Sequence, residues 1–127
     1  MENKEYQKEV LRTETLDFKG IENRLSNQAT IRLLHAGIGL ATEAGEFLDA
    51  IKKHIYYGKE LDVTNLIEEL GDLYWYINVA QDTLAITTEE VQELNIKKLK
   101  ARYPNKFTKE TALNRDLYVE RVILENR

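Results

Sequence analysis

Two short motifs in this sequence place acidic side chains in pairs. Glu43 and Glu46 are three residues apart, and Glu69 and Asp72 repeat that spacing after an interval of 22 residues. Side chains at positions i and i+3 of an α-helix project from nearly the same side. If the two motifs lie on neighbouring helices, the four carboxylates can face one another.

Four carboxylates gathered at the edge of a core repel one another unless a cation joins them. Oxygen-only donors suit Mg²⁺, with Mn²⁺ as a substitute, better than zinc. Such a site fits phosphoryl transfer, which needs charge neutralisation and alignment more than a protein nucleophile. The same acids would also arise without a metal, as solvated groups or helical ion pairs in a chain with 22 acidic residues.

A di-iron carboxylate bundle is the competing metal site, and it needs Glu-x-x-His motifs. Neither His35 nor His54 has a glutamate three residues before it, so this reading is set aside. Both histidines are interpreted as structural or exposed. Glu68 would take the place of Glu69 only if its helix were rotated, so Glu69 is preferred.

Two further residues share the helix faces of the acidic pairs. Tyr76 lies one turn after Asp72, and Lys53 lies two turns after Glu46, so both are expected to face a substrate. The remainder of the first stripe consists of small residues: Ala36, Gly39 and Ala50. Trp75 points elsewhere on a regular helix and is expected to pack internally or to form an interface.

A third group of polar residues lies on a later expected helix. Asn95, Lys98 and Arg102 are at positions i, i+3 and i+7, so they share one face. An amide, an ammonium and a guanidinium group suit phosphate oxygens, although a solvated basic face gives the same pattern. The adjacent face is apolar and is expected to pack in the core: Ile96, Leu99 and Tyr103.

Hydrophobic periodicity predicts the helices that carry the acidic pairs. The region 28–57 has one broad apolar face, which is expected to be buried, and Gly58 is a stop signal after it. That face contains Leu34, Ile38, Ala41, Leu48 and Ile55. Asp62 or Thr64 can cap the next helix, which should run to about Ala80. The short connection makes the two helices antiparallel neighbours.

The rest of the chain gives weaker signals. Residues 87–90, TTEE, form a capping box for a helix that Pro104 ends. A short helix is expected over residues 2–14 and a connection over 15–27. The tail from residue 111 has Leu113, Leu117 and Leu124 at helical spacing and is expected to be a helix, although LYVERVIL also fits a strand.

Composition bounds the fold class and the location. The 127 residues predict a single domain, 1–127, and with only 6 Gly and 1 Pro they favour an all-α, compact bundle of about four to five helices. There is no cysteine, which excludes disulfides, thiolate zinc sites and iron–sulfur clusters. A net charge of −4 argues against a nucleic-acid partner. No signal peptide or apolar stretch of about 20 residues is present, so a cytoplasmic protein without a membrane partner is expected.

Together these residues resemble the MazG-like, all-α nucleoside triphosphate pyrophosphohydrolases. That superfamily is marked by E-x-x-E, a spacer and E-x-x-D, which correspond to residues 43–46 and 69–72. GLATEAGEFLDAIKK and EELGDLYWYI are similar to its two metal-binding helices, and NIKKLKARYPNKF is similar to a stretch that follows in many small members. The resemblance covers about residues 30–107, and residues 108–127 have no counterpart in it.

The resemblance implies Mg²⁺-dependent hydrolysis of an NTP or dNTP to the monophosphate and pyrophosphate. By position, it makes four carboxylates the metal ligands and catalytic residues: Glu43, Glu46, Glu69 and Asp72. One of the glutamates would position or deprotonate the attacking water.

The resemblance also implies where the substrate binds. Tyr76 corresponds to a nucleoside-contacting position, and Asn95 and Lys98 match an element on the substrate and phosphate side. Lys98 and Arg102 would hold the departing pyrophosphate, and Lys53 is added to the substrate site on geometry alone. Family members assemble as dimers or tetramers, so a homo-oligomer is expected.

Two alternative functions remain at this point. A dUTPase-like member of the same superfamily would differ in base specificity. A helical adaptor or dimerisation module would use the acids only as surface groups and would ignore magnesium.

Overall fold

The computed structural model describes residues 2–126 and is all-helical over that range, as predicted. Its helices are α1 (Asn3–Leu11), α2 (Phe18–Leu25), α3 (Gln28–Tyr57), α4 (Val63–Leu84), α5 (Thr88–Arg102), α6 (Lys109–Leu113) and α7 (Leu117–Glu125). The expectation of four to five helices is therefore wrong for the described part of the chain, which has seven.

The extra helices are short and begin at capping residues. α2 occupies the region 15–27 that was expected to be a connection, and Asp17 caps it by accepting a hydrogen bond from the Gly20 N–H at 3.0 Å. In the tail, Thr108 and Asp116 cap α6 and α7 in the same way, so this part is helical and not a strand. Periodicity did not reveal α2, because it contains too little of an apolar stripe, whereas the tail, expected as one helix, divides into α6 and α7.

The main helices begin and end at the predicted signals. Gly58 ends α3 in the left-handed conformation, with φ of 66°. Asp62, and not Thr64, caps α4 by accepting from the Asn65 N–H at 3.0 Å. The capping box of Thr87 is present at the start of α5. α4 runs past Ala80 to Leu84, because no helix-stopping residue lies near position 80.

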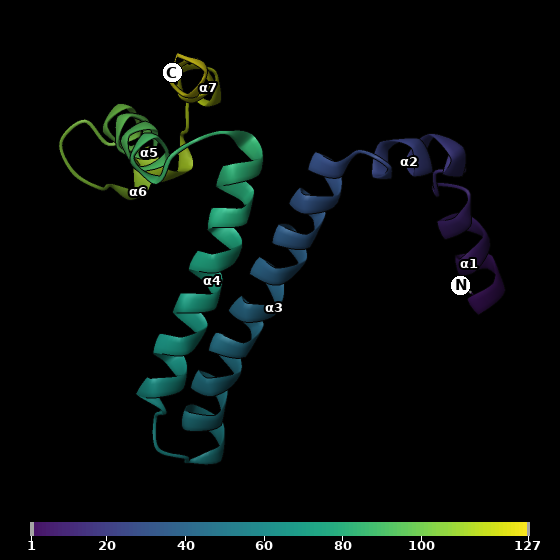
Figure 1. Cartoon of the computed structure of the whole chain (residues 1–127), viewed down its shortest axis with the longest axis horizontal. Coiled ribbons are helices and arrows are strands. Elements are labelled where there is room, and N and C mark those ends of the chain that lie inside the picture. The colour runs from purple at the N-terminus through teal and green to yellow at the C-terminus, as the bar shows by residue number, and fades with distance from the viewer. Residues whose placement is uncertain (1, 127) are drawn as a thin grey trace.

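A long helical hairpin is the centre of the structure (Figure 1). α3 and α4 run side by side in opposite directions and make the most extensive helix–helix contact. α5, α6 and α7 gather beyond the C-terminal end of α4, where α5 packs against α7. α2 contacts the start of α3, and α1 extends away from the hairpin.

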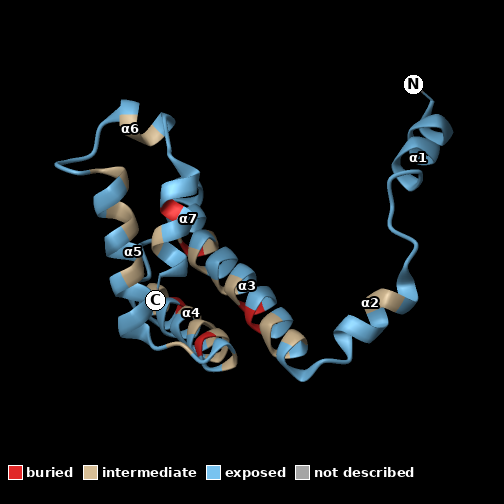
Figure 2. Ribbon diagram, turned by 90° about the horizontal axis from the view of Figure 1, so that it is seen from above, coloured by how far each residue is buried: buried red, intermediate tan, exposed pale blue. Residues whose placement is uncertain are grey.

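The single chain is not the compact bundle that composition suggests. Among residues 2–126, the buried apolar side chains are those of Ala36 and Ala50, both on α3. Figure 2 shows that most of the ribbon is exposed and that α3 and α4 carry buried and intermediate positions. On α3, the seam with α4 is therefore narrow and made of small residues.

The broad apolar face of α3 lies away from that seam. Leu34, Ile38 and Ile55 are exposed, and Leu48 is 64% exposed, so the expectation that this face is buried is wrong for the single chain. The small side chains of the other stripe allow α3 and α4 to approach closely, which leaves the larger residues uncovered. α4 likewise leaves large apolar side chains exposed: Ile67, Leu70 and Tyr74.

A buried ionic cluster fastens α7 to α5. Glu120 is only 5% exposed and accepts hydrogen bonds from the guanidinium groups of Arg102, at 2.7 and 2.5 Å, and Arg115, the shorter at 2.8 Å. These hydrogen bonds, first from Arg102 and then from Arg115, lower the pKa of Glu120 from 4.5 to about 2. The carboxylate of Glu120 is thus charged at any ordinary pH and pairs with both arginine side chains.

The lowered pKa predicts how acid loosens α7. A carboxylate whose pKa falls on folding stabilises the folded state above its unfolded pKa, and this stabilisation is lost as the pH falls. We expect α7 to detach from α5 between about pH 4.5 and pH 2, and Glu120→Gln to detach it already at neutral pH. Hydrogen exchange of the α7 amides measures this, with Glu125→Gln on the exposed side of the same helix as the control. Equal protection of the α7 amides in both variants at neutral pH would contradict the role of Glu120 in holding α7 to α5.

Candidate metal centre

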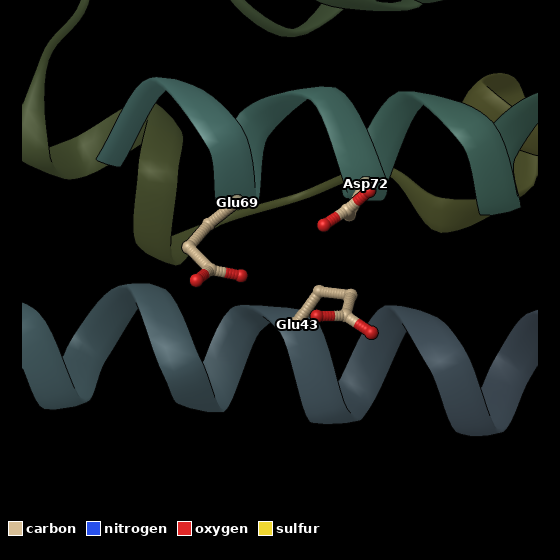
Figure 3. A group of neighbouring side chains, drawn as sticks. All are labelled: Glu43, Glu69 and Asp72. Atoms are coloured by element: carbon tan, nitrogen blue, oxygen red, sulfur yellow. The ribbon is translucent and has the colours of Figure 1, made fainter. Parts of the chain in front are cut away.

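Three carboxylates from the two hairpin helices meet at one point. One oxygen each from Glu43, Glu69 and Asp72 lies within 4.8 Å of the other two. Figure 3 shows Glu69 and Asp72 projecting from α4 towards Glu43 on α3. Glu69 is 4% exposed, Glu43 is half-buried and Asp72 is exposed, so the group opens from the helix interface to solvent.

The close packing of the hairpin positions this group. Ala36, Gly39 and Ala50 are buried against α4 on the same stripe as Glu43, which brings that side chain up to the facing helix. On α4, Asn65 lies one turn before Glu69 and donates a hydrogen bond from Nδ2 to its Oε1 at 2.7 Å. This bond orients the buried carboxylate.

The electrostatics of the group favour a cation. Burial raises the pKa of Glu43, and repulsion from Glu46, Asp72 and Glu69, in that order, raises it further. Within residues 2–126, none of these four acids forms an ion pair with a lysine, arginine or histidine. A cluster of carboxylate oxygens without a basic partner fits a hard divalent cation such as Mg²⁺.

Glu46 is the predicted ligand that lies outside this group. Its side chain is exposed, one turn further along α3, yet it is near enough to Glu43 to raise the pKa of that residue. The structure therefore brings together three of the four predicted carboxylates and places the fourth at their solvent edge.

Tyr76 and Lys53 were both expected beside the acids, but only Tyr76 lies there. A surface hollow next to Glu43 and Asp72 includes Tyr76 and not Lys53. Tyr76 and Trp75 line it together with Glu43 and Asp72, and its volume is about 340 Å³. Lys53 instead forms an ion pair with Asp49, with Nζ and Oδ2 2.6 Å apart.

The basic stripe of α5 lies far from the acids within one chain. Asp72 is twelve residues before the end of α4, which at 1.5 Å per residue is about 18 Å of helix. Asn95 is exposed and Lys98 is half-buried on α5, whose main packing partner is α7. Arg102 is held by Glu120.

The apolar face beside that stripe also differs from the expectation. Ile96 is exposed, and Leu99 and Tyr103 are only half-buried. The expectation that these residues pack in the core is therefore wrong for the single chain. They line a shallow hollow on the surface of α5 instead.

The structure places one aromatic residue differently from the expectation. Trp75, expected to point away from the acids, lines their hollow. His35 is exposed and lies edge-on to both Trp75 and Tyr76, which agrees with its interpretation as structural or exposed. The spacing of Trp75, three residues after Asp72, was the available signal. Residues at positions i and i+3 project from nearly the same side of a helix, so this spacing places Trp75 beside Asp72.

Comparison with known protein families gives a match that includes both acidic motifs. The model of the family described as the MazG nucleotide pyrophosphohydrolase domain matches residues 34–107, which is more than half of the chain. The chain therefore belongs to the MazG nucleotide pyrophosphohydrolase family, which confirms the resemblance found in its sequence. No curated protein and no solved structure matches it. None of the helices among residues 2–126 has both the length and the apolar composition needed to cross a membrane.

Proposed function

We propose that this protein is a Mg²⁺-dependent pyrophosphohydrolase that converts an NTP or dNTP to the monophosphate and pyrophosphate. The observation that carries the proposal is the meeting of Glu43, Glu69 and Asp72 on facing helices without a basic partner. Membership of a family of nucleotide pyrophosphohydrolases supports the reaction class. A cytoplasmic location remains part of the proposal.

In this proposal the carboxylates hold the metal and align the substrate. Glu43, Glu69 and Asp72 bind the cation, and Glu46 completes the predicted set from the solvent edge. The bound cation would neutralise phosphate charge and make a water molecule more acidic. Glu46 also accepts a hydrogen bond from water that enters the site. One of the glutamates takes a proton from the water, the water oxygen bonds to the α-phosphorus, the bond from that phosphorus to the bridging oxygen breaks, and pyrophosphate leaves with the electron pair of that bond.

A product assay tests this function. Incubation with the eight common NTPs and dNTPs, and with dUTP, in the presence of Mg²⁺ should give monophosphate and pyrophosphate from at least one of them. Release of diphosphate and free phosphate would contradict the proposed bond cleavage. Turnover of dUTP alone would identify the dUTPase-like alternative, and no turnover together with no response to Mg²⁺ would favour the adaptor.

We also propose that the protein forms a homo-oligomer, a dimer or a tetramer. Support comes from the large apolar side chains that both hairpin helices leave exposed. A surface of this kind is uncommon in a monomer and is typical of a protein–protein interface. A second copy would also be the means of bringing Asn95 and Lys98 towards the acids of the first, whereas Arg102 stays paired with Glu120.

A charged residue on the exposed apolar face of α3 should prevent the subunits from associating. Leu48→Glu is expected to convert the assembly to monomers, because it would bury an unpaired carboxylate in the interface. Light scattering after gel filtration measures the mass. Leu113→Glu, at the 84% exposed Leu113 of α6, is the matched control and should leave the mass unchanged. A monomeric wild-type protein would refute this part of the proposal.

A further inference from the structure

Three aromatic rings form a cluster beside the carboxylates. The ring centres of Trp75 and Tyr76 are 4.8 Å apart, those of His35 and Tyr76 are 5.6 Å apart, and those of His35 and Trp75 are 6.1 Å apart. All three pairs are edge-to-face, the arrangement that aromatic rings favour. The cluster joins α3 to α4, since His35 comes from one helix and the other two rings come from the other.

Within this cluster, packing restricts the ring of Tyr76, whereas the ring of Trp75 is exposed and can contact a ligand. Tyr76 lies so close to Gly39 that a Cβ atom there would be 2.1 Å from the ring, so the tyrosine has little freedom to move. Trp75 rests edge-on against Tyr76 yet remains 54% exposed. It is therefore a large ring that contacts Tyr76 and is more than half exposed to solvent.

The cluster adjoins the hollow of the acidic group. Trp75 and Tyr76 line that hollow together with Glu43 and Asp72. Along α4, Trp75 follows Asp72 by about 4.5 Å, and along α3, His35 precedes Glu43 by about 12 Å. A molecule with a polyphosphate at the carboxylates would therefore extend along the hairpin towards these rings.

We propose that the exposed indole of Trp75 is the stacking surface for the base of the nucleotide substrate, with His35 and Tyr76 as positioning residues. The proposal rests on the proposed function, because it assumes that the phosphates lie at the carboxylates. Stacking uses the flat face that every base presents. Trp75 thus distinguishes nucleotides from inorganic polyphosphates more than it distinguishes one base from another.

The chain contains its own reporter for this contact, because Trp75 is its single tryptophan. A nucleoside triphosphate with a non-hydrolysable α,β-bridge, added with Mg²⁺, should quench the tryptophan fluorescence in a saturable way. Inorganic tripolyphosphate, which has the phosphates but no base, should bind without this quenching. Absence of quenching by an analogue of a nucleotide that the enzyme hydrolyses would overturn the proposal.

Substitutions separate stacking from support of the acids. Trp75→Ala should raise the inhibition constant of the nucleotide analogue and the KM of the substrate roughly tenfold or more, the scale of one lost base–aromatic stack. Trp75→Phe should restore most of the affinity. The inhibition constant of tripolyphosphate should be unchanged in both. Tyr118→Ala, at an exposed aromatic residue of α7, is the control and should bind as the wild type does.

The outcomes distinguish this proposal from the proposed function. Normal KM in Trp75→Ala, or an equal loss of tripolyphosphate binding, would overturn the stacking role while leaving the pyrophosphohydrolase intact. If no nucleotide is hydrolysed, the proposed function fails, and the fluorescence titration still decides whether a base contacts Trp75.

Discussion

Glu69→Gln is expected to lower kcat/KM for the nucleotide substrate by at least about 100-fold, the order expected when a group that holds a catalytic metal is changed. Glu69 is the most buried of the three carboxylates that meet in the hairpin. Gln has nearly the same shape, and its Oε1 can still accept the hydrogen bond from Asn65. The substitution therefore removes the charge and leaves the packing in place.

Glu69→Gln should lower activity, but it should raise the stability of the metal-free protein. Removing one charge from a repelling group should raise the melting temperature of the metal-free protein. Mg²⁺ should raise the melting temperature of the wild type, because it binds only the folded state, and should raise that of Glu69→Gln less. Thermal melts with and without Mg²⁺, read beside steady-state kinetics, measure both effects.

Glu68→Gln is the control, since Glu68 is the adjacent acid and is exposed on a different side of α4. It should retain wild-type activity and the full response to Mg²⁺. If Glu68→Gln were the inactive variant and Glu69→Gln the active one, the rotation of α4 in this account would be wrong. Equal melting shifts in the wild type and Glu69→Gln would count against Glu69 as a ligand.

Gly39→Ala is expected to destabilise the protein by about 1–3 kcal/mol, the usual cost of overpacking a well-packed interface. The new Cβ would lie 2.1 Å from the Tyr76 ring, so either the ring must move or the two helices must separate. An alanine inside a helix normally gains up to about 1 kcal/mol over glycine, which is too little to offset the clash. Because Tyr76 lines the acidic hollow, substrate affinity should fall as well.

Gly37→Ala provides the matched comparison on the same helix. A Cβ at Gly37 meets no atom within 4 Å, so the variant should be as stable as the wild type or gain up to about 1 kcal/mol. Denaturant unfolding of both variants, with the KM of each, measures the difference. Equal stability of the two would show that Tyr76 does not pack over Gly39 in solution.

Local signals in the sequence predicted the ends of the main helices. Gly58, Asp62 and Thr87 act on backbone groups within one turn of themselves, so their effect does not depend on the rest of the fold. The helix α2 was missed, although its capping residue Asp17 is of the usual type. A cap without a long apolar stripe after it is a common pattern in loops and is ambiguous by itself.

The choice of packing face could not be predicted in the same way. Leu34 and Ile38 form the stronger apolar stripe of α3, yet α4 packs on the side of Ala36 and Gly39. Periodicity identifies an apolar face but not its partner. Whether that partner is another helix of the same chain or another molecule is decided by long-range contacts.

The acidic group was largely predictable, whereas its surroundings were not. The i, i+3 spacing and the short turn are enough to bring Glu43 opposite Glu69 and Asp72. The exposed position of Glu46 depends on the rotation of α3 against α4, which no motif specifies. The ion pair of Arg102 with Glu120 joins residues 18 positions apart, so no short sequence motif predicts it.

The turn at residues 58–62 also has a consequence for folding kinetics. Facing residues of α3 and α4 are close in sequence near the turn and grow steadily more distant away from it. The entropic cost of closing a loop rises with its length, so pairing that begins at the turn needs only short closures at each step. Ala50 is reached first, then Glu43 with Glu69 and Asp72, and the contact of Gly39 with Tyr76 later. Although Glu43 and Glu69 are 26 residues apart in the sequence, we expect successive short loop closures to assemble the acidic group before any part of the chain outside the hairpin needs to be in place.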